Sequence, residues 1–238
     1  MFNFAGQNPK IETVMTKKHF ILLLLIIVYQ SFVTNNLSAQ NNKIFRVAFW
    51  NLENYFDPFV DTTRVYNEYT EEGGQHWTMS RFYRKRNNLY KAILSLSEGE
   101  PLAILGICEV ENTFVTSMLF NETPLRKHNY RVIHYEGDDR RGIDVALVYS
   151  IDKLQLIYSG VVKIRNPDDE KFKSRDILYA KFYDKIGDTL HCFVNHWPSR
   201  YGGEKETIHL RNLAASCLKA QIDSLNYKII LDNKFKIT

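Results

Sequence analysis

Three polar side chains that could take part in chemistry follow apolar runs of the sequence. Asn51, Glu109 and His196 each stand at the end of a stretch that predicts a buried strand. Loops that a rigid sheet presents at its strand ends often carry binding and catalytic groups, so we expect the three to gather there. A carboxylate and a carboxamide oxygen suit a hard cation such as Mg²⁺, with Mn²⁺ or Ca²⁺ as alternatives. Cysteine and histidine clusters at zinc spacing are absent, which disfavours zinc.

The imidazole of His196 suggests a role in acid–base chemistry, because histidine is the side chain that titrates near neutral pH. Beside a metal-bound phosphate it could donate a hydrogen bond to a non-bridging oxygen or protonate a leaving alkoxide. Arg200 and the pair Gly202-Gly203 would allow close approach to an anionic ligand. A structural interpretation stays open, since a histidine can be satisfied at a loop entrance and a carboxylate after a strand often caps a helix.

Apolar runs predict the sheets that must position these groups. The expected strands cover residues 43–49, 102–108, 130–135, 143–149, 177–183, 189–194 and 227–231. The run 102–108, LAILGIC, is apolar throughout, as is typical of a strand buried on both faces. Residues 184–188 separate two runs and predict a hairpin turn.

Helical spacing appears in two further segments. From Ser80 onward, apolar residues fall on one side and the basic residues of 81–86 lie largely elsewhere. We favour a solvated face for this basic cluster, with phosphate contacts as the alternative. The second segment, residues 210–225, carries an apolar stripe. Residues 55–79 predict a long surface loop, whose Tyr55, Phe56 and Phe59 we expect to be buried rather than to contact a membrane.

The composition excludes intrinsic disorder, since 45% of the 238 residues are hydrophobic and 24% are charged. The net charge of +4 is too small to indicate nucleic acid by itself, so a basic surface would have to be local. Cys108, Cys192 and Cys217 are odd in number and widely spaced, which favours buried free thiols over disulfides. We expect no stable protein partner.

Residues 1–39 predict a secretory signal peptide. Lys17 and Lys18 precede the apolar run 20–28, and a polar stretch ends at Ala39 before the expected cleavage point. The run is shorter than the roughly 20 apolar residues of a membrane span, although an uncleaved anchor stays open. Residues 1–14 could be an over-extended start before Met15. We therefore expect a secreted or periplasmic domain over residues 40–238, with no transmembrane span in the mature chain.

Four ordered motifs carry a resemblance to a known family. They are FRVAFWNLENYFD, LGICEVEN, RRGIDVALVY and FVNHWPSRYGG, and they lie within residues 44–231. Together they resemble the endonuclease/exonuclease/phosphatase superfamily, in its exported bacterial branch. The resemblance implies an α/β fold, a four-layer sandwich of two mixed or antiparallel sheets flanked by helices. It also implies metal-dependent hydrolysis of phosphate esters, with DNA or RNA as substrates to consider.

The resemblance assigns roles to individual residues. Glu109 matches the main metal ligand, Asn51 matches an asparagine that organises metal and phosphate, and His196 matches a catalytic histidine. Pocket or substrate-binding positions are implied for Arg141, Asp144, Asn195 and Arg200.

The sequence departs from the family pattern near its end. The family has a Gly-Asp-x-Asn motif after a strand and a later Asp-His pair, whereas residues 232–238 read DNKFKIT. We therefore expect a chain that lacks the C-terminal part, including the last strands, and whose activity is impaired. The alternatives are a non-catalytic phosphate- or metal-binding remnant, a lipid phosphodiesterase and a sugar-phosphate phosphatase.

Overall fold

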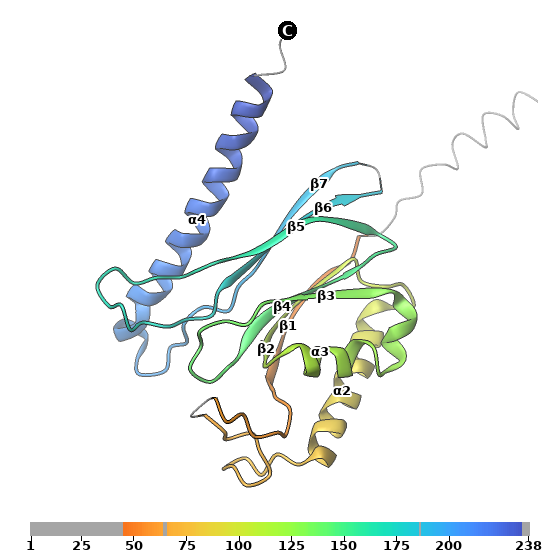
Figure 1. Ribbon diagram of the computed structural model, residues 1–238. Coiled ribbons are helices and arrows are strands. Elements are labelled where there is room, and N and C mark those ends of the chain that lie inside the picture. Colours follow the sequence, from red (N-terminus) through yellow and green to blue (C-terminus); the bar gives the residue numbers. More distant parts are fainter. Residues whose placement is uncertain (1–44, 64–65, 186, 235–238) are drawn as a thin grey trace, which may run out of the picture. The chain divides into compact units, whose positions relative to one another are not determined.

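Two sheets organise the residues that a computed structural model of the chain describes, which are 45–63, 66–185 and 187–234 (Figure 1). The first sheet has the order β1-β2-β4-β3, with β1 (Val47–Tyr55) parallel to β2 (Ile104–Val110). In this sheet β3 (Tyr130–His134) and β4 (Asp144–Ser150) pair in antiparallel fashion. The second sheet is antiparallel and contains β5 (Leu154–Val162), β6 (Ile177–Asp184) and β7 (Thr189–Val194).

The two sheets pack face to face around an apolar core. Alternate residues of each strand point to one face, so every second residue of β4 meets the second sheet. Leu147 and Tyr149 pack there with Ala180 and Phe182 of β6. β2 is buried on both faces as predicted, since its other face joins a second core beneath the helices.

Helices cover the outer face of each sheet. On the first sheet lie α2 (Met79–Ser97), α3 (Thr113–Phe120) and the short 3-10 helix η1 (Pro124–His128) (Figure 1). Side-chain caps begin all three helices: Thr78 accepts a hydrogen bond from the Arg81 amide, Asn112 from the Val115 amide, and Thr123 from the Leu125 amide. The second sheet is covered at one end by α4 (Glu204–Lys234), whose buried Ala214 lies in a cluster with Ile177, while Tyr158 and Tyr183 of that sheet stay exposed.

The resulting order of layers is helix, sheet, sheet, helix. This arrangement of mixed and antiparallel sheets confirms the predicted α/β sandwich. The hairpin of β6 and β7 and the helix after Ser80 are also confirmed.

One predicted strand is wrong. Residues 227–231 continue α4 instead of forming a core strand. A short apolar run does not distinguish a strand from a helix segment. Here the apolar positions 218, 225 and 229 extend the spacing of the preceding helix, and adding residues to an existing helix costs less than starting a new element.

Other boundaries also differ from expectation. β1 runs on to Tyr55, so Asn51 lies inside the strand and not after it. Neither α3 nor β5 was predicted. β5 is an edge strand of the second sheet with an irregular burial pattern, so the alternation that signals a strand is weak.

The loop between β1 and α2 is less exposed than predicted. Phe56 and Trp77 are buried, and the ring of Tyr69 stacks on Phe56 at 4.5 Å between centroids. The Trp77 indole N–H donates to the Phe56 carbonyl at 2.9 Å. Tyr55 is buried as expected, whereas the side chain of Phe59 is exposed. This aromatic packing fixes the loop beside the end of β1.

The predicted signal peptide lies outside the described residues. Within the described part of the chain, none of the helices combines the length and the hydropathy needed to cross a membrane. Cys108, Cys192 and Cys217 are free thiols there, of which Cys108 is buried and the other two half-buried.

Candidate active site

Three predicted site residues meet at one end of the first sheet. Asn51 lies in β1, Glu109 in β2 and His196 two residues after β7. The Asn51 side-chain amide donates to Glu109 Oε1 at 3.1 Å, and His196 Nε2 lies 3.3 Å from the same oxygen. The backbone N–H of Asn54 donates to Glu109 Oε2 at 2.9 Å. The carboxylate of Glu109 is therefore the centre on which the other groups converge.

The backbone around this carboxylate is strained. Glu53, Asn54 and Glu109 have φ angles of 56°, 62° and 59°, in the left-handed region that non-glycine residues rarely adopt. The register of β1 with β2 also shifts between Asn51 and Tyr55. Such irregularities re-aim side chains and persist only where the surroundings enforce them. Here they turn the amide of Asn54 toward Glu109.

The hydrogen bonds to Glu109 lower the pKa of its carboxyl to about 2. The largest cause is the hydrogen bond with His196, and those from Asn51 and Asn54 act in the same direction. Burial of the carboxyl opposes them without reversing the shift. Glu109 is thus ionised at neutral pH and presents a fixed negative charge.

Arg175 supports this site and was not predicted from the sequence. Its buried guanidinium donates to the carbonyls of His196 at 3.1 Å and Trp197 at 2.8 Å. It also donates to Asp139 Oδ2 at 3.1 Å. Because Asp139 comes from the loop between β3 and β4, Arg175 ties that loop to the backbone that carries His196.

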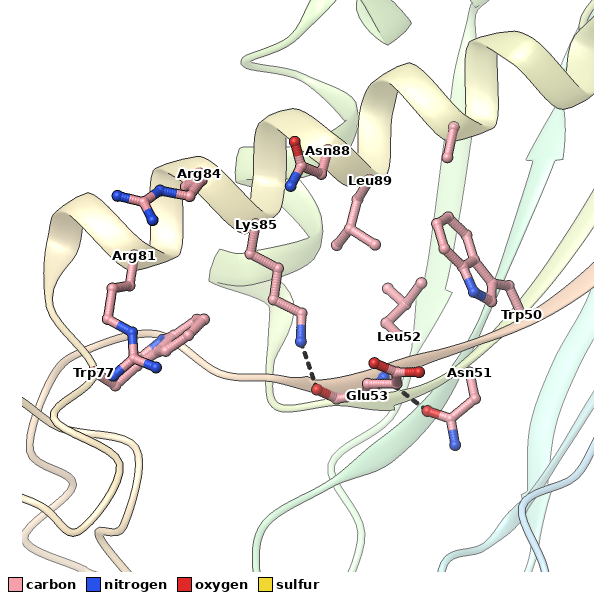
Figure 2. A pocket seen from close by; sticks show the side chains of 11 residues that line it. Trp50, Asn51, Leu52, Glu53, Trp77, Arg81, Arg84, Lys85, Asn88 and Leu89 are labelled. Atoms are coloured by element: carbon pink, nitrogen blue, oxygen red, sulfur yellow. Dashed lines mark hydrogen bonds between the residues drawn. The ribbon is translucent and has the colours of Figure 1, made fainter.

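A basic cleft of about 590 Å³ adjoins the site between α2 and β1 (Figure 2). Arg81, Arg84 and Lys85 line it from α2, and Asn51 and Glu53 line it from β1. Figure 2 shows Lys85 reaching across to donate to the Glu53 carbonyl. Burial lowers the pKa of Lys85, and the charges of Glu53 and Glu109 oppose that effect. Part of the basic cluster of residues 81–86 therefore faces a cleft. The sequence alone could not decide between this arrangement and a solvated helix face.

The remaining predicted pocket residues lie around this centre without touching Glu109. The Arg141 amide donates to Asp139 Oδ1 at 2.9 Å, so Arg141 belongs to the same loop network. The Asn195 carboxamide oxygen accepts from the Trp197 indole at 3.3 Å. Arg200 is exposed and lies 3.6 Å from Glu204. Their roles in binding substrate stay predictions.

Asp144 takes a different place. It is buried at the start of β4, and its Oδ2 atom lies 3.5 Å from Nε2 of His134. Among the hydrogen bonds of the described residues, none joins a backbone donor to this carboxylate.

An ionised glutamate held by asparagine and histidine lies at the edge of the two-sheet sandwich, an arrangement that could hold a cation. The family comparison agrees, since residues 46–234 match the model of the endonuclease/exonuclease/phosphatase family, and the chain belongs to that family. Members of this family are hydrolases of phosphate esters and generally use divalent metals. No curated protein matches the chain.

Solved structures of related fold share little sequence with the chain. ANGEL2, described as a 2′,3′-cyclic phosphatase, is 18% identical over 65% of this chain and 41% of its own, with a TM-score of 0.46. A family protein from Bacteroides vulgatus is 22% identical over 61% of this chain and 49% of its own, with a TM-score of 0.39. One from Bacteroides thetaiotaomicron is 17% identical over 63% of this chain and 55% of its own, with a TM-score of 0.45. The chain spans about half the length of these structures.

The donor atoms at the centre fit a divalent metal. Glu109 supplies an ionised carboxylate, an oxygen ligand of the kind that Mg²⁺ prefers. The carboxamide oxygen of Asn51 accepts the backbone N–H of Glu53 at 2.7 Å and its amide nitrogen faces Glu109, so the carboxamide would have to turn to ligate the ion. The carboxamide oxygen of Asn54 is buried and makes no hydrogen bond with the described residues. A buried oxygen of this kind needs a partner, which the described residues do not supply.

Proposed function

We propose that this chain is a Mg²⁺-dependent phosphodiester hydrolase of nuclease type. The observation that carries the proposal is the ionised Glu109, held at once by Asn51, Asn54 and His196. A single glutamate with this many donors in a strained segment is poorly explained as a surface residue, because strain persists where surrounding contacts enforce it.

The residues have separate roles in the proposed reaction. Glu109 and Asn51 would hold the Mg²⁺, which when bound acts as a Lewis acid toward a phosphoryl oxygen. The imidazole of His196 would donate a hydrogen bond to a non-bridging phosphate oxygen or a proton to the leaving oxygen. Arg175 would hold the backbone of His196 in place, so that the imidazole ring stays directed at Glu109 during the reaction.

The cleft beside the site favours a nucleic acid as the substrate. Nucleic acids bind through contacts between cationic side chains and successive phosphates. Arg81, Arg84 and Lys85 provide such cations within one cleft that also includes Asn51. A lipid substrate has weaker support, because Tyr55 and Phe56 are buried and cannot form a membrane-binding loop with Phe59.

The test compares Glu109→Gln with Glu122→Gln, since Glu122 is exposed and lies outside the site. Hydrolysis of bis(p-nitrophenyl) phosphate and of single-stranded DNA is measured in the full chain with and without Mg²⁺. We expect Glu109→Gln to lose roughly 100-fold or more, because even indirect partners of a metal cost 10- to 100-fold. Glu122→Gln should match the parent chain.

Two results would count against the proposal. Equal turnover by Glu109→Gln and the parent chain would remove the metal role of Glu109. Mg²⁺-dependent binding of DNA without turnover in the parent chain would favour the non-catalytic binding alternative.

We also propose export of the chain, as the signal-peptide pattern of residues 1–39 suggests. Expression of the full chain in a bacterial host, followed by fractionation and N-terminal sequencing, tests this. A periplasmic or secreted product that begins at Gln40 supports export, and an uncleaved cytoplasmic product contradicts it.

A further inference from the structure

A second cluster of metal-ligating side chains lies at the junction of β3 and β4. His134 ends β3, Asp144 begins β4, and Glu136 follows in the loop that connects them. One ligand atom from each of the three lies within 4.8 Å of the others. His134 pairs with Ala146, so Asp144 stands two residues away on the same face of the sheet.

The imidazole of His134 is buried without a hydrogen bond. Its side chain is only 2% exposed, and neither ring nitrogen has a hydrogen-bond partner among the described residues. A buried polar group in this state costs about 1–3 kcal/mol unless something else satisfies it. The unsatisfied ring nitrogens of His134 therefore indicate a bound ligand at this position.

The distance between His134 and Asp144 fits metal ligation better than hydrogen bonding, while Oε1 of Glu136 lies 3.9 Å from the other ring nitrogen, Nδ1. Nε2 of His134 lies 3.5 Å from Oδ2 of Asp144, beyond the usual 2.7–3.2 Å of an N–H···O hydrogen bond. Two ligands of a tetrahedral Zn²⁺, bound at about 2.0–2.1 Å each, lie about 3.4 Å apart. The pair is thus spaced as two ligands of one ion would be.

The loop backbone approaches the side chain of Asp144 closely. A Cβ atom at Gly137 would lie 2.5 Å from Oδ1 of Asp144, so a side chain at position 137 would displace that carboxylate. The neighbouring Glu136 has a side chain that is 52% exposed, which leaves the cluster accessible from solvent.

The surrounding charges favour a cation. Burial raises the pKa of Asp176, and the charges of Asp138 and Asp144 add to that effect. Lys163 partly offsets this negative charge, since its Nζ lies 2.9 Å from Asp176 and 3.2 Å from Asp138. Among the interactions of the described residues, the contacts of Lys163 are with these two aspartates, whereas Asp144 faces His134.

We propose that His134, Glu136 and Asp144 bind a first-row transition-metal ion, with Zn²⁺ as the best fit, at a site distinct from the Glu109 centre. Imidazole and carboxylate together are zinc ligands, even though the sequence lacks the clusters that signal zinc. Bound there, the ion clamps the loop that carries Asp139 to the end of the sheet. Asp139 in turn holds Arg175, which supports His196.

The experiment measures Zn²⁺ binding to the full chain in excess Mg²⁺, with Co²⁺ absorption as a reporter of tetrahedral ligation. Glu136→Gln is the main variant, because a half-exposed side chain can be changed without loss of the fold. His134→Asn removes the buried ligand. Glu109→Gln tests the other centre, and His209→Asn, which changes an exposed histidine of α4, is the control.

We expect Glu136→Gln to weaken Zn²⁺ binding roughly tenfold or more and His134→Asn to abolish it. Glu109→Gln and His209→Asn should bind one Zn²⁺ as tightly as the parent chain. Failure of the parent chain to bind Zn²⁺ in excess Mg²⁺ would overturn the proposal and leave an ion pair of His134 with Asp144. Loss of the ion in Glu109→Gln, with retention in Glu136→Gln, would overturn it as well.

Discussion

The buried Arg175 gives the sharpest test of how the site is held together. Arg175→Met keeps an unbranched apolar stem of similar size but removes every donor of the guanidinium. The carbonyls of His196 and Trp197 then lose their donor, and the carboxylate of Asp139 loses its closer ion pair while Nε of Arg141 stays 3.8 Å away. The side chains of Arg175 and Asp139 are 10% and 8% exposed, so water reaches neither group easily.

The expected loss of stability follows from these contacts. Removing one member of a buried ion pair costs about 3–5 kcal/mol, since the other charge stays buried. His196 and Trp197 lie in a loop that is partly exposed, so water can reach their carbonyls and the cost should stay near ~3 kcal/mol. Arg175→Lys keeps the charge but not the planar fork, and should lose about half as much.

Urea unfolding of the full chain, followed by tryptophan fluorescence, measures the change. Arg165→Met serves as the control, because Arg165 is an exposed arginine of the preceding segment. A second measurement separates positioning from stability: ¹³C NMR of Glu109 reports its carboxyl pKa. That pKa should rise from about 2 toward 4.5 in Arg175→Met, since the hydrogen bond with His196 is its largest cause.

The reasoning fails if Arg175→Met lies within about 1 kcal/mol of Arg165→Met, because a buried ion pair cannot be broken at so small a cost. It also fails in part if the protein is destabilised while the Glu109 pKa stays unchanged. Arg175 would then support the fold without positioning His196.

Three further outcomes are expected. The carboxyl pKa of Glu109 is depressed from 4.5 to about 2, so its contribution is present above pH 4.5 and is lost as pH falls toward 2. The pKa shift corresponds to at most ~3 kcal/mol of folding stability, or ~1–2 kcal/mol after solvent screening. Unfolding free energies of Glu109→Gln and of the parent chain, compared at pH 6 and pH 3, measure this contribution. Gly137→Ala should destabilise the chain by about 1–3 kcal/mol in urea unfolding, because its Cβ would meet Asp144; a neutral result would show that the loop can shift. Burial raises the thiol pKa of Cys108 to about 12 and that of Cys192 to about 11, so both should react slowly with a disulfide reagent at pH 8, and fast labelling of either would contradict their burial.

The central strands β2 and β6 could be predicted from the sequence because burial leaves a direct trace in it. β2 is apolar almost throughout, and the edge strand β7 could be placed because it follows β6 across a turn with a glycine. β5 left no such trace, since an edge strand buries few of its residues. The helical end of the chain was missed for a different reason: an apolar run of five residues fits a strand and a helix equally well, and only the preceding helix decides between them.

The same distinction applies to the site. Asn51, Glu109 and His196 could be predicted because each follows an apolar run, and strand ends meet at the edge of a sheet. Arg175 lies 21 residues from His196 and 36 from Asp139, so their contact depends on how the two sheets pack. The left-handed backbone of Glu53 and Asn54 likewise follows from strand pairing rather than from residue type.

The side chains that hold His196 in place are therefore different from those that would contact the substrate. The contacts of Asn51 and Asn54 with Glu109 are made by strand residues of one sheet, and their geometry is fixed once β1 and β2 pair. The backbone of His196, by contrast, depends on Arg175, which depends on Asp139 in a connecting loop. Loops are less constrained than strands, so this loop needs an anchor of its own if the ring of His196 is to keep its place. The cluster around His134 lies where that anchor is needed, at the two strand ends from which the loop departs.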